Sequence, residues 1–232
     1  TPPTAFQVRR SDFDNLLFRH AARLGATTFE GARIADVDLG AGAGDPAGNG
    51  ARRPVRVTLT LGEDETREIR ARFMVDATGR DTLLGRKLGL KERHPTHRSA
   101  AVFAHFNNAS RRPGRDGGNI SIYWFEHGWI WMIPLRDGTI SVGVVADPAF
   151  FKGFAANDDA FDAGIRSCPP ARDRLAAAAR ASDFQATGNF SYFCKRMHGE
   201  RFLLVGDAFA FLDPIFSSGV YVAMSSAEQA AA

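Results

Sequence analysis

Apolar side chains recur at helical spacing near the start of the chain and at strand spacing over most of its remaining length. Between residues 12 and 24 they form one stripe, which predicts a helix with Ser11 as its N-cap and Gly25 just beyond its end. Alternating or apolar segments then predict short strands at residues 27–29, 33–39, 55–60 and 67–75. The first part of the chain is therefore predicted to be a helix followed by a small antiparallel sheet.

A second group of strand-like segments begins near residue 99. Strands are expected at residues 100–106, 120–125, 128–135 and 139–145, with a tight hairpin at residues 136–138. Helices at 158–166 and 171–181 come next, then strands at 184–193 and 201–205 and a helix that starts near Ser217. This order predicts an α/β fold of α+β character.

Composition and charge exclude several function classes. The chain has 232 residues, of which 44% are hydrophobic, and its net charge of +3 is spread without a basic cluster, so nucleic acid is not expected as a partner. Asp207 and Asp213 interrupt the richest apolar segment, so no membrane span is expected. Two cysteines and no signal peptide favour a cytoplasmic location, and the histidine spacing indicates no metal site.

A glycine-rich segment contains a short nucleotide-binding pattern. Gly42, Gly44 and Ala47 match G-x-G-x-x-A, but Pro46 and the lack of a following helical stripe contradict the strand-turn-helix context that a phosphate site needs. We interpret residues 40–53 as a hairpin tip.

Residues 202–224 carry the most informative chemistry. A buried strand ends at Gly206 and Asp207, which places a carboxylate where ribose or ribitol hydroxyls can donate to it. Pro214 ends the extended segment, and Ser217, Ser218 and Gly219 then offer backbone amides at a helix start, an arrangement that attracts anions. The same residues also fit an ordinary turn followed by a capped helix.

Three segments resemble the FAD-dependent monooxygenase and reductase superfamily that shares the para-hydroxybenzoate hydroxylase fold. The resemblance of residues 202–224 implies that Gly206, Asp207, Pro214, Ser217 and Gly219 lie at the cofactor, with Asp207 on the ribityl and pyrophosphate part of FAD. The segment FMVDATGR resembles an Asp-Ala-x-Gly motif, which implies that Asp76, Ala77 and Gly79 lie on the adenine side. Residues 7–14 resemble V-x-R-x-x-F-D, which implies that Arg10 binds the cofactor. The fold expected from this resemblance is a partial three-layer FAD-binding domain, formed by residues 1–98 and 183–232, and an antiparallel-sheet substrate domain, with helices, formed by residues 99–182.

A further pattern resembles flavin-dependent halogenases. Trp129, Trp131 and Pro134 fit the marker W-x-W-x-I-P, and residues 211–219 fit F-x-x-P-x-x-S-x-G. The resemblance implies that the Ser218 and Gly219 amides hold a halide ion beside the flavin, and that the tryptophans keep the organic substrate away from it. Strand periodicity places both tryptophans on one face, although a simple hydrophobic strand in a sheet has the same pattern.

The resemblance implies a flavoprotein oxidoreductase of secondary metabolism that uses reduced FAD, oxygen and halide on an aromatic phenol or pyrrole. Its partners would be that substrate, an acyl or peptidyl carrier protein that tethers it, and a separate flavin reductase. Two alternatives remain open: an aromatic hydroxylase or geranylgeranyl-reductase-like flavoenzyme, and a non-catalytic domain that keeps only the fold. The superfamily's opening G-x-G-x-x-G unit and the halogenase lysine precede the matched region, so we expect the 232 residues to be an internal piece that is inactive alone.

Overall fold

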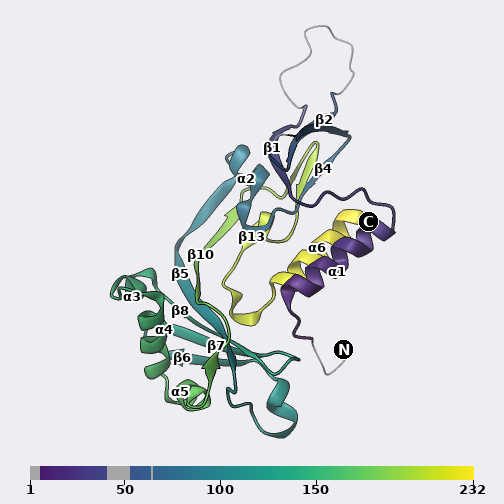
Figure 1. Ribbon diagram of the computed structural model, residues 1–232. Helices are drawn as coiled ribbons and strands as arrows, with labels where there is room; N and C mark the ends of the chain where they lie inside the picture. The colour runs from purple at the N-terminus through teal and green to yellow at the C-terminus, as the bar shows by residue number, and fades with distance from the viewer. Residues whose placement is uncertain (1–5, 41–52, 64) are drawn as a thin grey trace. The chain divides into compact units, whose positions relative to one another are not determined.

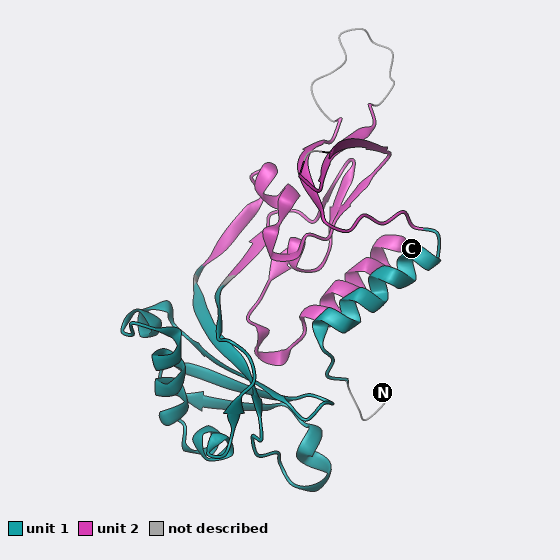
Figure 2. Ribbon diagram, viewed as in Figure 1, with its two compact units in different colours: residues 1–25, 95–190 teal, residues 26–94, 191–232 magenta. Residues whose placement is uncertain are grey.

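The computed structural model describes residues 6–40, 53–63 and 65–232, and it divides into two compact units (Figures 1 and 2). Unit 1 comprises Thr1–Gly25 and Pro95–Phe190, and unit 2 comprises Ala26–His94 and Ser191–Ala232. The G-x-G-x-x-A match lies outside the described residues. Assignment of residues 1–98 and 183–232 to an FAD-binding domain and of residues 99–182 to a substrate domain stays a prediction.

Unit 1 is built on an antiparallel sheet. The order of the whole sheet is β13, β10, β5, β8, β7 and β6, with its edge strand β13 in unit 2, and short β9 pairs with β5. The bounds are β5 Lys91–Asn107, β6 Ser121–Phe125, β7 Gly128–Pro134, β8 Ile140–Ala146, β9 Ala179–Arg180 and β10 Gln185–Cys194. The remaining elements are α1 Arg10–Arg23, η2 Gly114–Gly118, α3 Pro148–Lys152, α4 Asn157–Arg166 and α5 Pro169–Leu175. The expected hairpin forms between β7 and β8, where Gly138 has a φ of +93°.

The core of unit 1 lies between one face of this sheet and α4 and α5. Alternate residues of β7 and β8 point into it, including Ile130, Met132 and Val144, and Phe161 of α4 fills the space opposite them. A Cβ at Gly164 would lie 2.5 Å from Val144 Cγ1, so α4 can approach the sheet this closely only with glycine at that position. The tryptophans of β7 lie on the other face of the sheet.

Unit 2 contains two small sheets. One is antiparallel, in the order β1 Ala32–Asp38, β2 Val55–Leu61 and β3 Glu65–Ala71. The other has the order β11 His198–Gly199, β12 Phe202–Leu204 and β4 Met74–Asp76, and β12 and β4 run parallel. The shorter elements and the last helix are η1 Gly79–Asp81, α2 Leu83–Lys87, η3 Gly206–Ala208, β13 Ala210–Phe211, η4 Pro214–Phe216 and α6 Gly219–Ala231. A core that includes Val37, Val55, Leu84 and Leu204 joins these sheets to α2.

Several predicted elements are wrong, among them the helix at 171–181, because α5 ends at Leu175 and residues 179–180 form β9. The helix α1 begins at Arg10, ahead of Ser11, and no side chain caps it; Arg10 instead pairs with Asp14 one turn further on. Residues 27–29 form no strand, and the single strand predicted at residues 67–75 is two strands in different sheets. No helix in the described part of the chain combines the length and apolar content that crossing a bilayer requires.

Candidate functional site

Both predicted flavin motifs of unit 2 lie at one edge of its parallel strand pair. Leu204 in β12 is in register with Asp76 in β4, so the two strands end side by side. The Val205 amide donates to the Asp76 carbonyl at 3.0 Å just before the chain turns through Gly206 and Asp207. Ligands of open α/β sheets bind at this carboxyl edge, so the fold brings the two motifs together where a cofactor site is expected.

The carboxylate of Asp76 shapes the turn just after it. It is 1% exposed; Oδ1 accepts from the Thr78 amide at 2.9 Å and from Thr78 Oγ1 at 2.6 Å, while Oδ2 accepts from the Leu84 amide at 2.7 Å. These bonds fix the loop through Ala77 and Gly79. Gly79 has a φ of +60°, and a Cβ there would meet no atom within 4 Å, so the backbone stands open to a ligand.

Gly206 connects the second motif to α6. Its φ is +55°, and a Cβ at this position would lie 3.1 Å from the Cα and Cβ of Ala223. The Gly206 amide also donates to Ser226 Oγ at 2.9 Å. Glycine is therefore required both by the backbone conformation and by the close approach of the helix. The next residue, Asp207, is half-buried, and its carbonyl accepts from the Tyr192 hydroxyl at 2.7 Å.

The loop from Pro214 to Gly219 presents the start of α6. Pro214 begins η4, and the Ser217 amide donates back to its carbonyl at 2.8 Å; Ser217 then takes a left-handed φ of +52°. Ser218 is the N-cap of α6, and no side chain caps the helix. Among the described residues, no group accepts a hydrogen bond from the Ser218 or Gly219 amide. Two amides at the positive end of a helix dipole are thus available to an anion, which fits the halide site expected from the sequence.

The tryptophans of β7 are held on the sheet face opposite the core of unit 1. Trp131 lies across from Gly143, where a Cβ would come within 2.2 Å of the indole ring, so the ring rests directly on the β8 backbone. Its Nε1 donates to Ser141 Oγ at 3.2 Å, and the Phe103 and Trp129 rings lie 5.7 and 5.9 Å away. The two tryptophans are therefore rigidly placed. Pro134, which ends β7, is buried.

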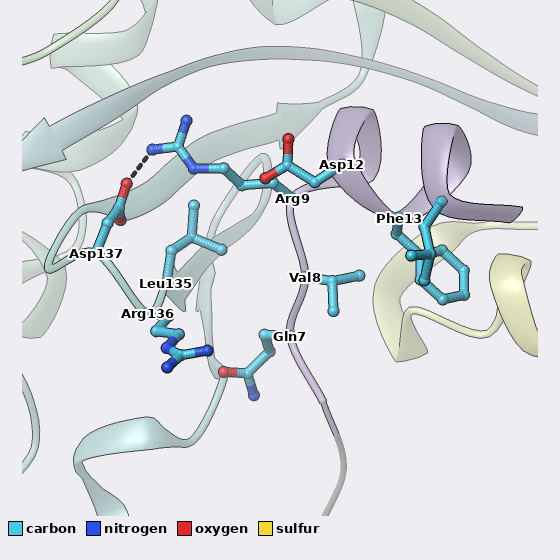
Figure 3. A pocket seen from close by; sticks show the side chains of 9 residues that line it. Gln7, Val8, Arg9, Asp12, Phe13, Leu135, Arg136 and Asp137 are labelled. Carbon is cyan, nitrogen blue, oxygen red and sulfur yellow. Dashed lines mark hydrogen bonds and ion pairs between the residues drawn. The ribbon is translucent and has the colours of Figure 1, made fainter. Parts of the chain in front are cut away.

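A cavity of about 670 Å³ lies beyond the end of β7, lined by Leu135–Asp137 and by residues of the segment 7–16 (Figure 3). An ion pair between Arg9 and Asp137 crosses it. Hydrogen bonds from the Thr139 hydroxyl and amide, and to a smaller extent the Arg9 guanidinium, together lower the pKa of Asp137 to about 2. Arg10 is not among the residues that line this cavity; its Nε and Nη2 donate to Asp14, each at 2.9 Å.

The predicted residues fall into two sets. Asp76, Ala77, Gly79 and the residues from Gly206 to Gly219 belong to unit 2, whereas Arg10, Trp129, Trp131 and Pro134 belong to unit 1. Sequence reasoning missed Arg9 and Tyr192. Arg9 occupies the variable position of the V-x-R pattern, and its partner Asp137 lies in a distant hairpin. Tyr192 occurs in a strand without any motif.

The residues present fit an FAD and halide site in two respects: an open glycine backbone at the carboxyl edge of parallel strands, and free amides at a helix start. The contribution of each predicted residue to binding stays a prediction.

Comparisons with known proteins agree with this geometry. Residues 2–232 match the family model described as tryptophan halogenase. A 1H-pyrrole-2-carbonyl-(peptidyl-carrier protein) chlorinase from Pseudomonas fluorescens is 36% identical over 96% of this chain and 49% of its own length. The corresponding brominase from Pseudoalteromonas luteoviolacea is 33% identical over 97% of this chain and 54% of its own length.

Solved structures give the same result. The flavin-dependent halogenase CmlS has a TM-score of 0.88 at 33% identity, covering 100% of this chain and 41% of that one. The brominase Bmp2 has a TM-score of 0.82 at 31% identity, covering 95% of this chain and 54% of that one. The chain spans about half the length of the curated relatives it matches. From its family match and its fold, the chain belongs to the tryptophan halogenase family of flavin-dependent halogenases.

Proposed function

We propose that the full-length gene product is an FAD-dependent halogenase that attaches halogen to an electron-rich aromatic ring, a phenol or a pyrrole. The observation that carries the proposal is the pair of Ser218 and Gly219 amides, which have no acceptor among the described residues and lie at the start of α6. An aromatic hydroxylase has no need of such a halide site next to its flavin.

Each part of the site has a role in this proposal. Reduced FAD, when bound, supplies the activation of oxygen that oxidises the halide. Gly79 and Gly206 let the backbone approach the cofactor, Asp207 accepts from its hydroxyls, and Asp76 holds the first turn in shape. The Ser218 and Gly219 amides hold the halide by hydrogen bonding and through the helix dipole.

Trp129 and Trp131 keep the organic substrate from the flavin, so that halide and not carbon is oxidised there. Trp131 suits this role because its ring is fixed by Gly143 below, by Ser141 at Nε1 and by Phe103 beside it. A wall that moved aside would let the substrate reach the oxidant directly.

The names of two relatives support a carrier-bound substrate. The chlorinase and the brominase are both named for pyrrole-2-carbonyl groups on a peptidyl-carrier protein. We propose that this enzyme likewise takes an aromatic acyl group from a carrier protein, that a separate flavin reductase supplies its reduced FAD, and that it acts in the cytoplasm.

The test is a product assay with the full-length gene product, reduced FAD, oxygen and bromide. Free phenol, free pyrrole and the same rings on a carrier protein are offered separately, and mass spectrometry identifies bromine by its isotope pattern. Brominated product supports the proposal, with the carrier-bound ring as the faster substrate. Hydroxylated product without bromine establishes a hydroxylase instead, and unchanged substrate in every arm refutes the halogenase assignment.

A matched pair of variants tests the halide site. Gly219→Pro removes one amide at the first helical position and also disfavours the α-region backbone of Ser218 (φ −81°, ψ −6°), whereas Gly219→Ala keeps the amide and adds a Cβ that meets no atom within 4 Å. We expect Gly219→Pro to raise the halide KM about tenfold or more and Gly219→Ala to leave it within about twofold. Equal KM values for the two variants would contradict the role of this amide.

A further inference from the structure

Four residues of unit 2 contact one another in a closed series, here called the Lys91 cluster: Arg80, Phe211, Tyr192 and Lys91. The Arg80 guanidinium lies 4.9 Å from the centroid of the Phe211 ring, and that ring stacks on Tyr192 at 6.0 Å and 27°. Lys91 Nζ lies 3.6 Å from the centroid of the Tyr192 ring and donates to the Arg80 carbonyl at 3.2 Å. The series of contacts thus begins and ends at Arg80.

The Lys91 cluster connects three segments that carry separate sequence motifs. Arg80 directly follows Gly79 of the first flavin motif, and Phe211 opens the F-x-x-P-x-x-S-x-G segment. Tyr192, 4% exposed, donates its hydroxyl to the Asp207 carbonyl in the second motif and is in register with Phe211 across β10 and β13. These contacts therefore link the three segments.

Phe211, which is in register with Tyr192 across β10 and β13, lies just before the loop that is proposed to hold the halide. Beyond it, the side chains of Leu212 and Phe216 are 72% and 88% exposed and contribute little packing. At the far end of the loop, the Gly206 amide holds α6 by its bond to Ser226 Oγ. The position of Phe211 therefore sets where the loop begins, and the bonds from the Ile215 amide to Asp213 Oδ1 and from the Ser217 amide to the Pro214 carbonyl shape the rest of its path.

We propose that Lys91 and Tyr192 are positioning residues for halide binding: the Lys91 ammonium holds the Tyr192 ring, which holds Phe211 and so sets the loop that presents the Ser218 and Gly219 amides. Neither residue belongs to a motif of the family resemblance, and neither touches the halide. The role rests on the proposed halide site and extends it to residues outside it. A cation over a shielded aromatic face is a stronger contact than one in water, which suits Lys91 to this task.

The chain supplies a matched control. Lys195 comes directly after the end of β10 in unit 2, but its ammonium pairs with Glu92 at 2.9 Å, and the two side chains are 58% and 45% exposed. An exposed pair of this kind contributes little to folding. Lys195→Met therefore removes a positive charge from the same unit without changing a residue of the Lys91 cluster.

The experiment compares Lys91→Met, Lys91→Arg, Tyr192→Phe and Lys195→Met with the parent in the full-length gene product. Chloride affinity is measured from NMR line broadening of the chloride ion, which needs no turnover, and the halide KM is measured where product forms. We expect Lys91→Met to weaken chloride binding about fivefold, Lys91→Arg to restore it to within about twofold, and Lys195→Met to have no effect. Tyr192→Phe keeps the stacked ring but loses the bond to the Asp207 carbonyl, and its effect on chloride binding falls between those of Lys91→Met and Lys91→Arg.

Flavin content, the KM for the aromatic substrate and the melting temperature separate positioning from folding. Under the proposal, all three stay at parent values in Lys91→Met while chloride binding weakens. Unchanged chloride binding overturns the proposal, and so does a parallel loss of flavin, stability and chloride binding that arginine fails to rescue. If no variant or parent halogenates, the proposed function fails, whereas the chloride measurement still decides the role of Lys91.

Discussion

Single residues in this chain act through the turns they hold as much as through groups they offer to a ligand. Asp76 was predicted as a cofactor ligand from its motif, yet both of its carboxylate oxygens accept from the chain itself. The motif could be recognised from sequence, but the bond to Leu84 could not, because it depends on how α2 folds back over the turn. Trp131 shows the opposite case, since strand periodicity predicted its face correctly.

Replacing Asp76 tests its structural role. Asp76→Asn keeps one acceptor oxygen but presents an amide NH₂ to a backbone or hydroxyl donor, so one or two buried bonds are lost. We expect a loss of about 1–3 kcal/mol in the free energy of unfolding, measured with urea. Asp81→Asn, on the exposed face of the same loop, is the control and should change stability by less than about 0.5 kcal/mol. Equal losses would contradict the role assigned to the buried carboxylate.

The Asp137 carboxylate should make stability depend on pH in the acid range. Its pKa is lowered from 3.8 to about 2 by bonds from Thr139 and by Arg9, so the folded state favours the ionised form. Its contribution is present above pH 4, declines as the pH falls and is lost near pH 2. The melting temperature of Asp137→Ala should therefore lie below that of the parent at pH 7, and the two should converge near pH 2. A difference that does not change with pH would show that the charge is unimportant.

At the scale of elements, long periodic segments were predictable and short ones with distant partners were not. The strands β6, β7 and β8 lie within about two residues of their predicted bounds because each pairs with its neighbour in sequence. Residues 67–75 looked like one strand, but β3 pairs with β2 whereas β4 pairs with β12, far along the chain. Local pattern holds no information about that second partner, so the change of sheet after Ala71 was missed.

Substitution of two glycines of unit 2 distinguishes the cost of backbone strain from the cost of a clash with a helix. Gly79 and Gly206 both have positive φ, but only at Gly206 would a Cβ meet α6, at 3.1 Å from Ala223. Gly79→Ala should cost about 1–2 kcal/mol of unfolding free energy from the left-handed backbone alone. Gly206→Ala should cost more and should also weaken chloride binding, since α6 must shift. Equal losses, with chloride binding intact, would show that α6 adapts freely.

At the scale of the whole chain, each unit has its own hydrophobic core, and each core contains one cysteine. Cys168 is buried in unit 1 and Cys194 in unit 2, and burial raises the pKa of the Cys194 thiol. The strands β5 and β10 each begin in one unit and end in the other. Backbone continuity of this kind favours cooperative unfolding of the two cores.

Alkylation of the two thiols measures that cooperativity. In the native protein, iodoacetamide should react slowly with both, because both are buried and the Cys194 thiol resists ionisation. With increasing urea, mass spectrometry should find both cysteines becoming reactive over the same concentration range. Exposure of one thiol well before the other would show instead that the units unfold independently.

The contact between Trp131 and Gly143 limits which positions can be changed on the sheet face that carries Trp129 and Trp131. Any side chain at position 143 overlaps the indole of Trp131. Most variants in a mutagenesis library that changes this position would therefore be misfolded or mispacked. Phe103 and Ser141 touch the same indole from beside it and leave the backbone beneath it intact. Engineering for a larger or differently shaped ring should therefore begin at positions 103 and 141 and retain glycine at 143.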